Sequence, residues 1–90
     1  MTFVADAAED LELELRGYMA FAGRHVGWQY GVEIHAGGDE IVVETDDRYL
    51  HSELHGAGFD IGSVDETGPG QFRFTVTGYD GRASFADCAE

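Results

Sequence analysis

The stretch HAGGDEIVVE, residues 35–44, is the part of the sequence from which the fold can be worked out. Its glycine pair, Gly37 and Gly38, supplies the backbone freedom of a turn. Apolar residues recur at every second position from Trp28 to Ile34 before the turn, and again at Ile41 and Val43 after it. Such alternation is typical of half-buried strands, and a short glycine-containing loop between two of them predicts a β-hairpin.

A second hairpin is predicted 31 residues further along the chain, where residues 66–75 correspond to residues 35–44. The stretches match at a turn glycine and at alternating apolar residues: Gly37 with Gly68, Ile41 with Phe72, and Val43 with Phe74. Few of the matched positions are identical, so the correspondence does not establish a gene duplication. It predicts that one supersecondary unit occurs twice.

A helix is predicted ahead of the first hairpin, over residues 6–26. Leu13 and Phe21 lie off its main helical stripe, which contains six other apolar residues: Leu11, Leu15, Tyr18, Met19, Ala22 and Val26. Residues 11–16 also alternate between Leu and charged residues, which is compatible with a strand. The composition, rich in Ala, Leu and Glu with a single β-branched residue, favours the helix. Gly17 within it is expected to cost about 1 kcal/mol relative to alanine.

A second, shorter helix is predicted over residues 48–58, with Leu50, Leu54 and Ala57 on one face. Gly56 and Gly58 are placed to end it. The element order is then helix, strand, strand, helix, strand, strand. We therefore predict one α+β domain over residues 1–90, a two-layer αββαββ sandwich. Its four-stranded antiparallel sheet would carry both helices on one face. Residues 1–5 and 80–90 are expected to be flexible termini.

The charge of the chain indicates the ionic environment in which the protein functions. Eighteen Asp and Glu face five Arg and no Lys, for a formal net charge of −13. At an ionic strength of about 1 M the Debye length falls to about 3 Å, which screens the self-repulsion of such a surface. We predict a protein adapted to the high-salt cytosol of an extreme halophile. The single cysteine, Cys88, and the expected absence of a signal peptide or membrane span agree with a soluble cytoplasmic protein. The sequence contains no stripe of basic residues, so nucleic-acid binding is not favoured.

The tetrapeptide Gly37-Gly38-Asp39-Glu40 resembles the motif of diguanylate cyclases, which also lies on a hairpin. The resemblance covers four residues, and no equivalent of that family's nucleotide pocket follows in the sequence. Under the 31-residue shift these positions correspond to the turn Gly68-Pro69-Gly70-Gln71. We therefore interpret the tetrapeptide as a turn. No set of catalytic residues is predicted, so the chain is expected to be a binding protein rather than an enzyme.

Asp47, His51 and His55 lie four residues apart and would form one stripe on the second helix. Imidazoles at this spacing can bind a divalent metal such as zinc, with the carboxylate or a histidine from a strand completing the site. The alternative is a solvated helix edge on which Asp47 supports His51 and His55 lies near the helix C-terminus. A metal- or small-ligand-binding protein built on this set is the second of two predicted functions; a bound cofactor is otherwise not expected.

The open face of the predicted sheet is the other candidate site. Gln29, Glu33, His35, Arg73 and Thr75 are expected to point away from the helices. Open sheet faces and sheet edges are common docking surfaces. The first predicted function is accordingly a non-enzymatic protein-interaction or regulatory module that binds a protein partner or forms a homodimer.

Overall fold

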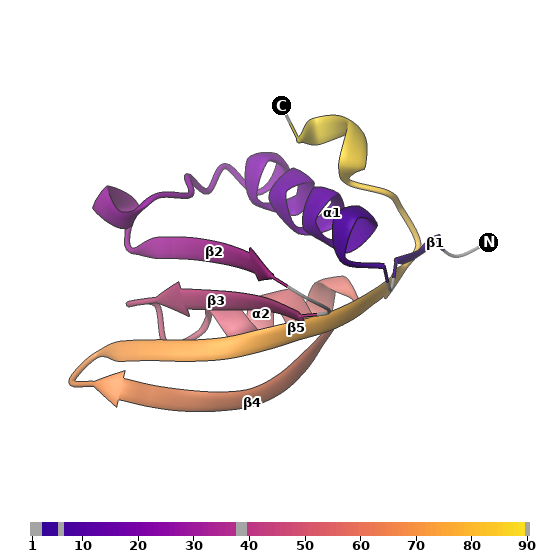
Figure 1. Cartoon of the computed structure of the whole chain (residues 1–90). Helices are drawn as coiled ribbons and strands as arrows, with labels where there is room; N and C mark the ends of the chain where they lie inside the picture. Colours follow the sequence, from indigo (N-terminus) through magenta and orange to yellow (C-terminus); the bar gives the residue numbers. More distant parts are fainter. Residues whose placement is uncertain (1–2, 6, 38–39, 90) are drawn as a thin grey trace.

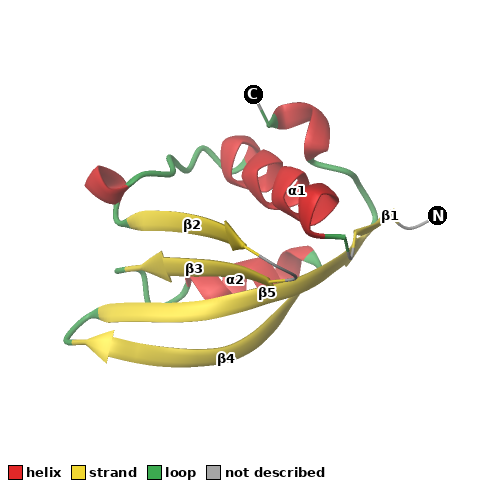
Figure 2. Ribbon diagram, viewed as in Figure 1, coloured by secondary structure: helices red, strands yellow, loops and turns green. Residues whose placement is uncertain are grey.

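The fold is α+β, with two helices and an antiparallel sheet, as the sequence predicted, and the sheet is curled (Figures 1 and 2). The computed structural model describes residues 3–5, 7–37 and 40–89. The helices are α1 (Ala8–Phe21) and α2 (Leu50–Ala57). The strands are β1 (Phe3–Ala5), β2 (Val32–Gly37), β3 (Glu40–Thr45), β4 (Phe59–Gly68) and β5 (Gln71–Gly81). The described residues also form two 3-10 turns: η1 (Trp28–Tyr30) and η2 (Ala86–Cys88). Within the described ranges, no helix is long and apolar enough to cross a membrane.

Strand β5 organises the sheet. Its first half pairs with β3 on one side, and its second half pairs with β1 on that same side, through Phe3 opposite Gly81. On its other side β5 pairs with β4, and β2 pairs with β3. The long strands therefore run in the order β2-β3-β5-β4, with β2 and β4 at opposite borders (Figure 1). The first residues of the chain, expected to be flexible, include β1.

The two hairpins close at corresponding positions. Gly37 is opposite Glu40 in the first, and Gly68 is opposite Gln71 in the second. Each residue of the closing pair in the second hairpin lies 31 positions after its counterpart in the first. Residues 38 and 39 of the glycine-containing turn lie outside the described residues. The helices differ in length, and the pseudo-repeat and the two-layer arrangement stay predictions.

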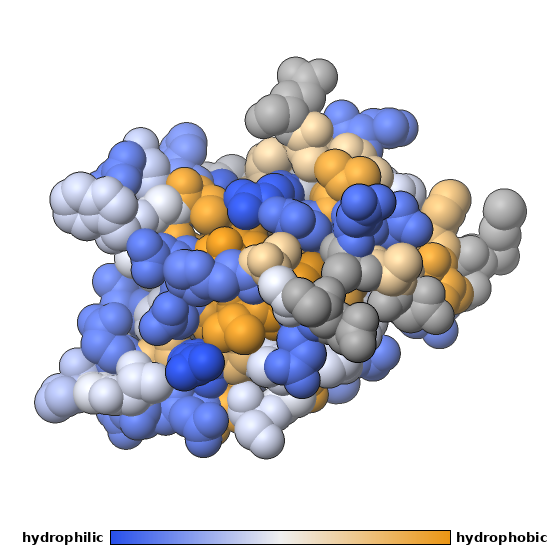
Figure 3. Space-filling view, in the orientation of Figure 1, coloured by the Kyte–Doolittle hydropathy of each residue, from blue (hydrophilic) through white to orange (hydrophobic). Residues whose placement is uncertain are grey.

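Both helices contribute to a single hydrophobic core. The predicted stripe of α1 supplies Leu11, Leu15, Tyr18 and Met19, and α2 supplies Leu50 and Leu54. Alternate strand residues meet them, including Val32, Ile41, Val43, Phe74 and Val76. Figure 3 shows apolar surface between α1 and the strands with hydrophilic side chains around it. Each fully buried aliphatic side chain contributes about 1.5–3 kcal/mol, so this cluster is the main source of stability.

The predicted strand from Trp28 was wrong over its first four residues: Trp28–Tyr30 form the 3-10 turn η1, Gly31 follows as its cap, and β2 begins at Val32. Gly27 and Gly31 flank the turn with φ angles of 152° and 74°, in a region that favours glycine. Gly27 and Val32 then form a bridge of their own. Trp28 and Tyr30 were expected to face the core, but their side chains are 79% and 54% exposed.

The segment after β5 is docked on α1, although residues 80–90 were expected to be flexible. The carboxylate of Glu14, only 5% exposed, accepts hydrogen bonds from Ser84 Oγ and from the backbone N–H groups of Phe85 and Ala86. Gly17 lies directly beneath, where a Cβ atom would overlap the backbone of Phe85. The Phe85 ring packs edge-on against Tyr18, at 5.2 Å between ring centroids. The buried Glu14 carboxylate therefore binds this segment through hydrogen bonds, and the lack of a side chain at Gly17 leaves the space in which the segment packs against α1.

A polar cluster joins the end of α1 to α2. Arg24 Nη2 lies 2.5 Å from Glu53 Oε1 and 3.1 Å from Asp47 Oδ2, and Tyr18 donates to Glu53 Oε2 at 2.7 Å. The hydrogen bond from Arg24 lowers the pKa of Glu53. Burial, reinforced by the hydrogen bond to Glu53, raises the pKa of Tyr18 to about 12. The phenol is therefore held in its protonated, donating form.

Tyr18 should give the protein an alkaline sensitivity. Because its pKa is raised from 10.0 to about 12, its contribution to stability is full below pH 10 and is lost as the pH rises towards 12. Tyr18→Phe should show a shallower loss of unfolding free energy over that window in urea titrations. Burial also raises the pKa of Tyr79, but Tyr79 is present in both proteins and contributes equally to the pH dependence of each. Equal pH slopes for the two proteins would contradict the assignment to Tyr18.

Candidate functional site

The predicted metal set on the second helix is not assembled. Asp47 lies ahead of α2, where its carboxylate pairs with Arg24 and accepts the backbone N–H of Tyr49. The ring of His51 lies against Phe74 at 6.2 Å between centroids, and His55 is exposed in the last turn. Only His51 and His55 keep the predicted spacing on the helix.

A different trio comes together on the outer face of the sheet. Glu33 and His35 point the same way from β2, and Glu44 is directly opposite Glu33 on β3. His35 Nε2 lies 3.0 Å from Glu44 Oε1 and 3.7 Å from Glu33 Oε2. One ligand atom from each residue lies within 4.8 Å of the other two, and no second such group occurs among the described residues. The side chains are 43–54% exposed, so solvent reaches the trio.

Trp28 stands beside these carboxylates. A shallow hollow of about 130 Å³ is bordered by Trp28, Glu33, Glu44 and Gln71, with Gly31, Val32 and Thr45 completing its lining. Carboxylates beside an exposed indole attract cationic groups, through charge and through the negative face of the ring. This end of the outer face therefore has the chemistry of a site for a basic side chain.

The remaining residues of the predicted surface are divided between two places. Arg73 and Thr75 lie on β5, where Arg73 is opposite Glu44 on one side and Asp65 on the other. Gln29 is in η1 and not on a strand. The structure thus brings Glu33, His35, Arg73 and Thr75 onto one face, and places Gln29 in the turn that precedes β2.

The two borders of the sheet differ in regularity. Strand β4 carries register shifts at three places and exposed acids such as Asp65, features that discourage pairing with another chain. Strand β2 pairs with β3 in six consecutive positions without a shift. Val32 exchanges backbone hydrogen bonds with Gly27, so its polar groups point away from β3. Because this direction alternates along an antiparallel strand, those of Ile34 and Ala36 also point outward.

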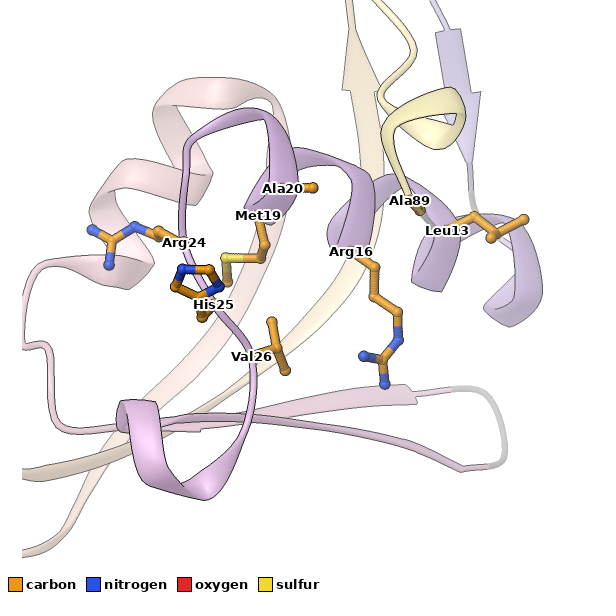
Figure 4. Close-up of a pocket in the computed structure, with 8 residues that line it drawn as sticks. All are labelled: Leu13, Arg16, Met19, Ala20, Arg24, His25, Val26 and Ala89. Carbon is orange, nitrogen blue, oxygen red and sulfur yellow. The ribbon is translucent and has the colours of Figure 1, made fainter.

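A larger groove of about 430 Å³ follows the flank of α1 and includes two of the five arginines, Arg16 and Arg24. Figure 4 shows Arg16 and Val26 pointing into the space between α1 and β2. Arg16 Nε is 2.8 Å from Glu12, and Arg24 is paired with Glu53 and Asp47. With both guanidinium groups already neutralised, the groove is a poor anion site.

Comparison with known proteins leaves the site to be judged on its chemistry: no family model, curated protein or solved structure matches this chain significantly.

Sequence reasoning missed Trp28, which it assigned to the core. The glycines on either side of the segment 28–30 are the signal that could have identified a turn. That Glu44 lies directly opposite Glu33 follows only from the register of β2 and β3.

Proposed function

We propose that this protein is a non-enzymatic interaction module that binds an extended, basic segment of a partner protein along strand β2. The observation that supports this most strongly is the regular outer border of β2, where the backbone groups of Ile34 and Ala36 have no hydrogen-bond partner among the described residues. An added strand gains main-chain hydrogen bonds from such a border, and side-chain pockets beside it supply the specificity.

The negative charge around β2 favours a partner segment with basic side chains. An added strand would place alternate side chains over the outer face, next to Glu33 and His35, with the hollow beside Trp28 at its end. Lysine or arginine fits a hollow bordered by two carboxylates and an indole. A net charge of −13 attracts a basic partner at long range at low ionic strength.

Self-association through β2 is the weaker candidate. The same border could pair with its copy, and a small domain benefits from a partner. Two chains of −13 repel each other, however, and the pairing would bring their Glu33 and Glu44 carboxylates together. In the proposed high-salt cytosol this repulsion is screened, so homodimers are expected chiefly in molar salt.

A pair of synthetic peptides tests the proposal. One alternates arginine with threonine, and the other carries glutamate in place of arginine. We expect only the basic peptide to shift the NMR signals of the Trp28 indole and of the Ile34 and Ala36 amides. Binding should weaken about tenfold in the double variant Glu33→Gln, Glu44→Gln, which removes two charges that contact the ligand. Asp80→Asn with Asp87→Asn removes equal charge from exposed positions away from β2 and should change little.

Ala36 separates strand pairing from simple charge attraction. Ala36→Pro removes one outward backbone donor and should weaken peptide binding about fivefold, the value of roughly one hydrogen bond. Ala36→Thr changes the same exposed residue but keeps the donor, so binding should persist. Equal binding by both variants, or equal binding of both peptides, would overturn strand addition. Light scattering on the same samples reports any homodimer.

A further inference from the structure

We propose that Glu33, His35 and Glu44 form a binding site for a divalent transition metal, with zinc as the best match. This inference does not depend on the proposed function, although the two sites share carboxylates. It places metal binding on the sheet and not on the helix stripe of Asp47, His51 and His55.

The spacing of the trio is close to that of a zinc coordination sphere. Zinc binds imidazole nitrogen at about 2.0–2.1 Å and carboxylate oxygen at about 2.0–2.2 Å, so neighbouring ligand atoms in a tetrahedron lie about 3.4 Å apart. The distances from His35 Nε2 to Glu44 Oε1 and to Glu33 Oε2, 3.0 Å and 3.7 Å, lie on either side of that value. Small side-chain rotations would suffice to make the three atoms ligands of one ion.

The backbone fixes this arrangement. Glu33 and His35 are two residues apart on one strand, and Glu44 is the direct cross-strand neighbour of Glu33. Strands β2 and β3 are paired on either side of all three residues, from Val32 with Thr45 to Gly37 with Glu40. The donors therefore project from a rigid ladder, which lowers the entropic cost of assembling them around an ion.

The donor set also indicates which metal binds. An imidazole favours zinc, nickel or copper over magnesium and calcium, which prefer sites made wholly of oxygen atoms. Two carboxylates neutralise a divalent charge, and the exposed position leaves room for water as a fourth ligand. Arg73, opposite Glu44 in the neighbouring strand, is the nearest basic residue in the register and is expected to moderate the affinity.

A bound metal ion would weaken binding of the basic segment. The ion would occupy the carboxylates that otherwise attract lysine or arginine, and it would cancel their negative charge. By thermodynamic linkage, the peptide must weaken zinc binding by the same factor by which zinc weakens peptide binding. The outer face would then respond to metal availability.

Zinc titration followed on the histidine ring protons tests the site, because the chain carries four histidines that report separately. We expect zinc to shift His35 strongly while His51 and His55 stay in place. His35→Gln and Glu44→Gln should each weaken zinc binding at least tenfold, judged by calorimetry. His51→Gln serves as the matched control and should leave the affinity unchanged, and magnesium should produce no shift of His35.

The outcomes separate the two proposals. Zinc shifts confined to His51 and His55, or no saturable shift of His35, would overturn the metal site while leaving peptide binding untouched. Zinc binding at His35 that fails to weaken the basic peptide would overturn the antagonism. If no basic peptide binds but zinc shifts His35, the metal site stands and the proposed function fails.

Discussion

Glu14→Ala is expected to lower the free energy of unfolding by about 3 kcal/mol, the largest effect of any single substitution considered. Glu14 is 5% exposed and accepts three hydrogen bonds from residues 84–86. Hydrogen bonds to a charged group contribute about 1.5–3 kcal/mol each. Removing the acceptor takes the Glu14 partner from the backbone N–H of Phe85 and leaves that of Ala86 with only Ser84 Oγ, at 3.3 Å. Urea unfolding measures the loss, and amide exchange should show residues 84–89 released first.

Glu12→Ala is the matched control for Glu14→Ala. It removes the same charge from the same helix, but the Glu12 side chain is 32% exposed and forms an i,i+4 pair with Arg16. Such pairs contribute about 0.2–0.5 kcal/mol in isolated helices. Similar losses in the two variants would show that helix charge, rather than docking of the last segment, explains the effect.

Gly17→Ala is expected to cost about 2 kcal/mol, although alanine is the better helix former by about 1 kcal/mol. An added Cβ would overlap the Phe85 carbonyl, and a backbone atom cannot move aside as the end of a side chain can. The last segment must lift, so the partly buried Phe85 ring loses its contacts with Tyr18, Phe21 and Tyr79. Displacing an aromatic side chain forfeits about 1.5–3 kcal/mol of burial.

The sign of the effect at Gly17 can be checked against Gly56, a glycine near the end of α2. A Cβ atom at Gly56 meets nothing within 4 Å, so Gly56→Ala should stabilise the protein by up to about 1 kcal/mol. The double variant Glu14→Ala, Gly17→Ala should lose less than the sum of the single losses, since each releases the same segment. Stabilisation by Gly17→Ala would contradict the direct contact between α1 and the segment.

Periodicity predicted the parts of the fold that burial dictates. The stripe of Leu11, Leu15, Tyr18 and Met19 and the alternation of Ile41 with Val43 reflect faces that are buried in the structure. Periodicity misplaced Trp28 because an alternating apolar residue looks the same in a strand and in a glycine-flanked turn. It also could not identify Glu14, whose burial depends on donors 70 residues away.

The candidate site was predictable only in part for a similar reason. Alternation along β2 placed Glu33 and His35 on one outward face, as the structure has them. Which residue of β3 lies opposite them depends on the register, and the turn length that sets it cannot be read reliably from composition. Helix α2 begins at Leu50, which leaves Asp47 of the predicted helix set in the preceding loop, where it pairs with Arg24. Metal binding by that set stays a prediction.

The bonds between Glu14 and residues 84–86 also have a consequence for how the chain reaches its fold. They join positions 70 to 72 residues apart, and β1 likewise pairs with the end of β5. Contacts of such long sequence separation form only after the entropy of closing a large loop has been lost, which slows folding. During synthesis α1 is made long before residues 84–86, so its docking partner becomes available only after β5 has been made.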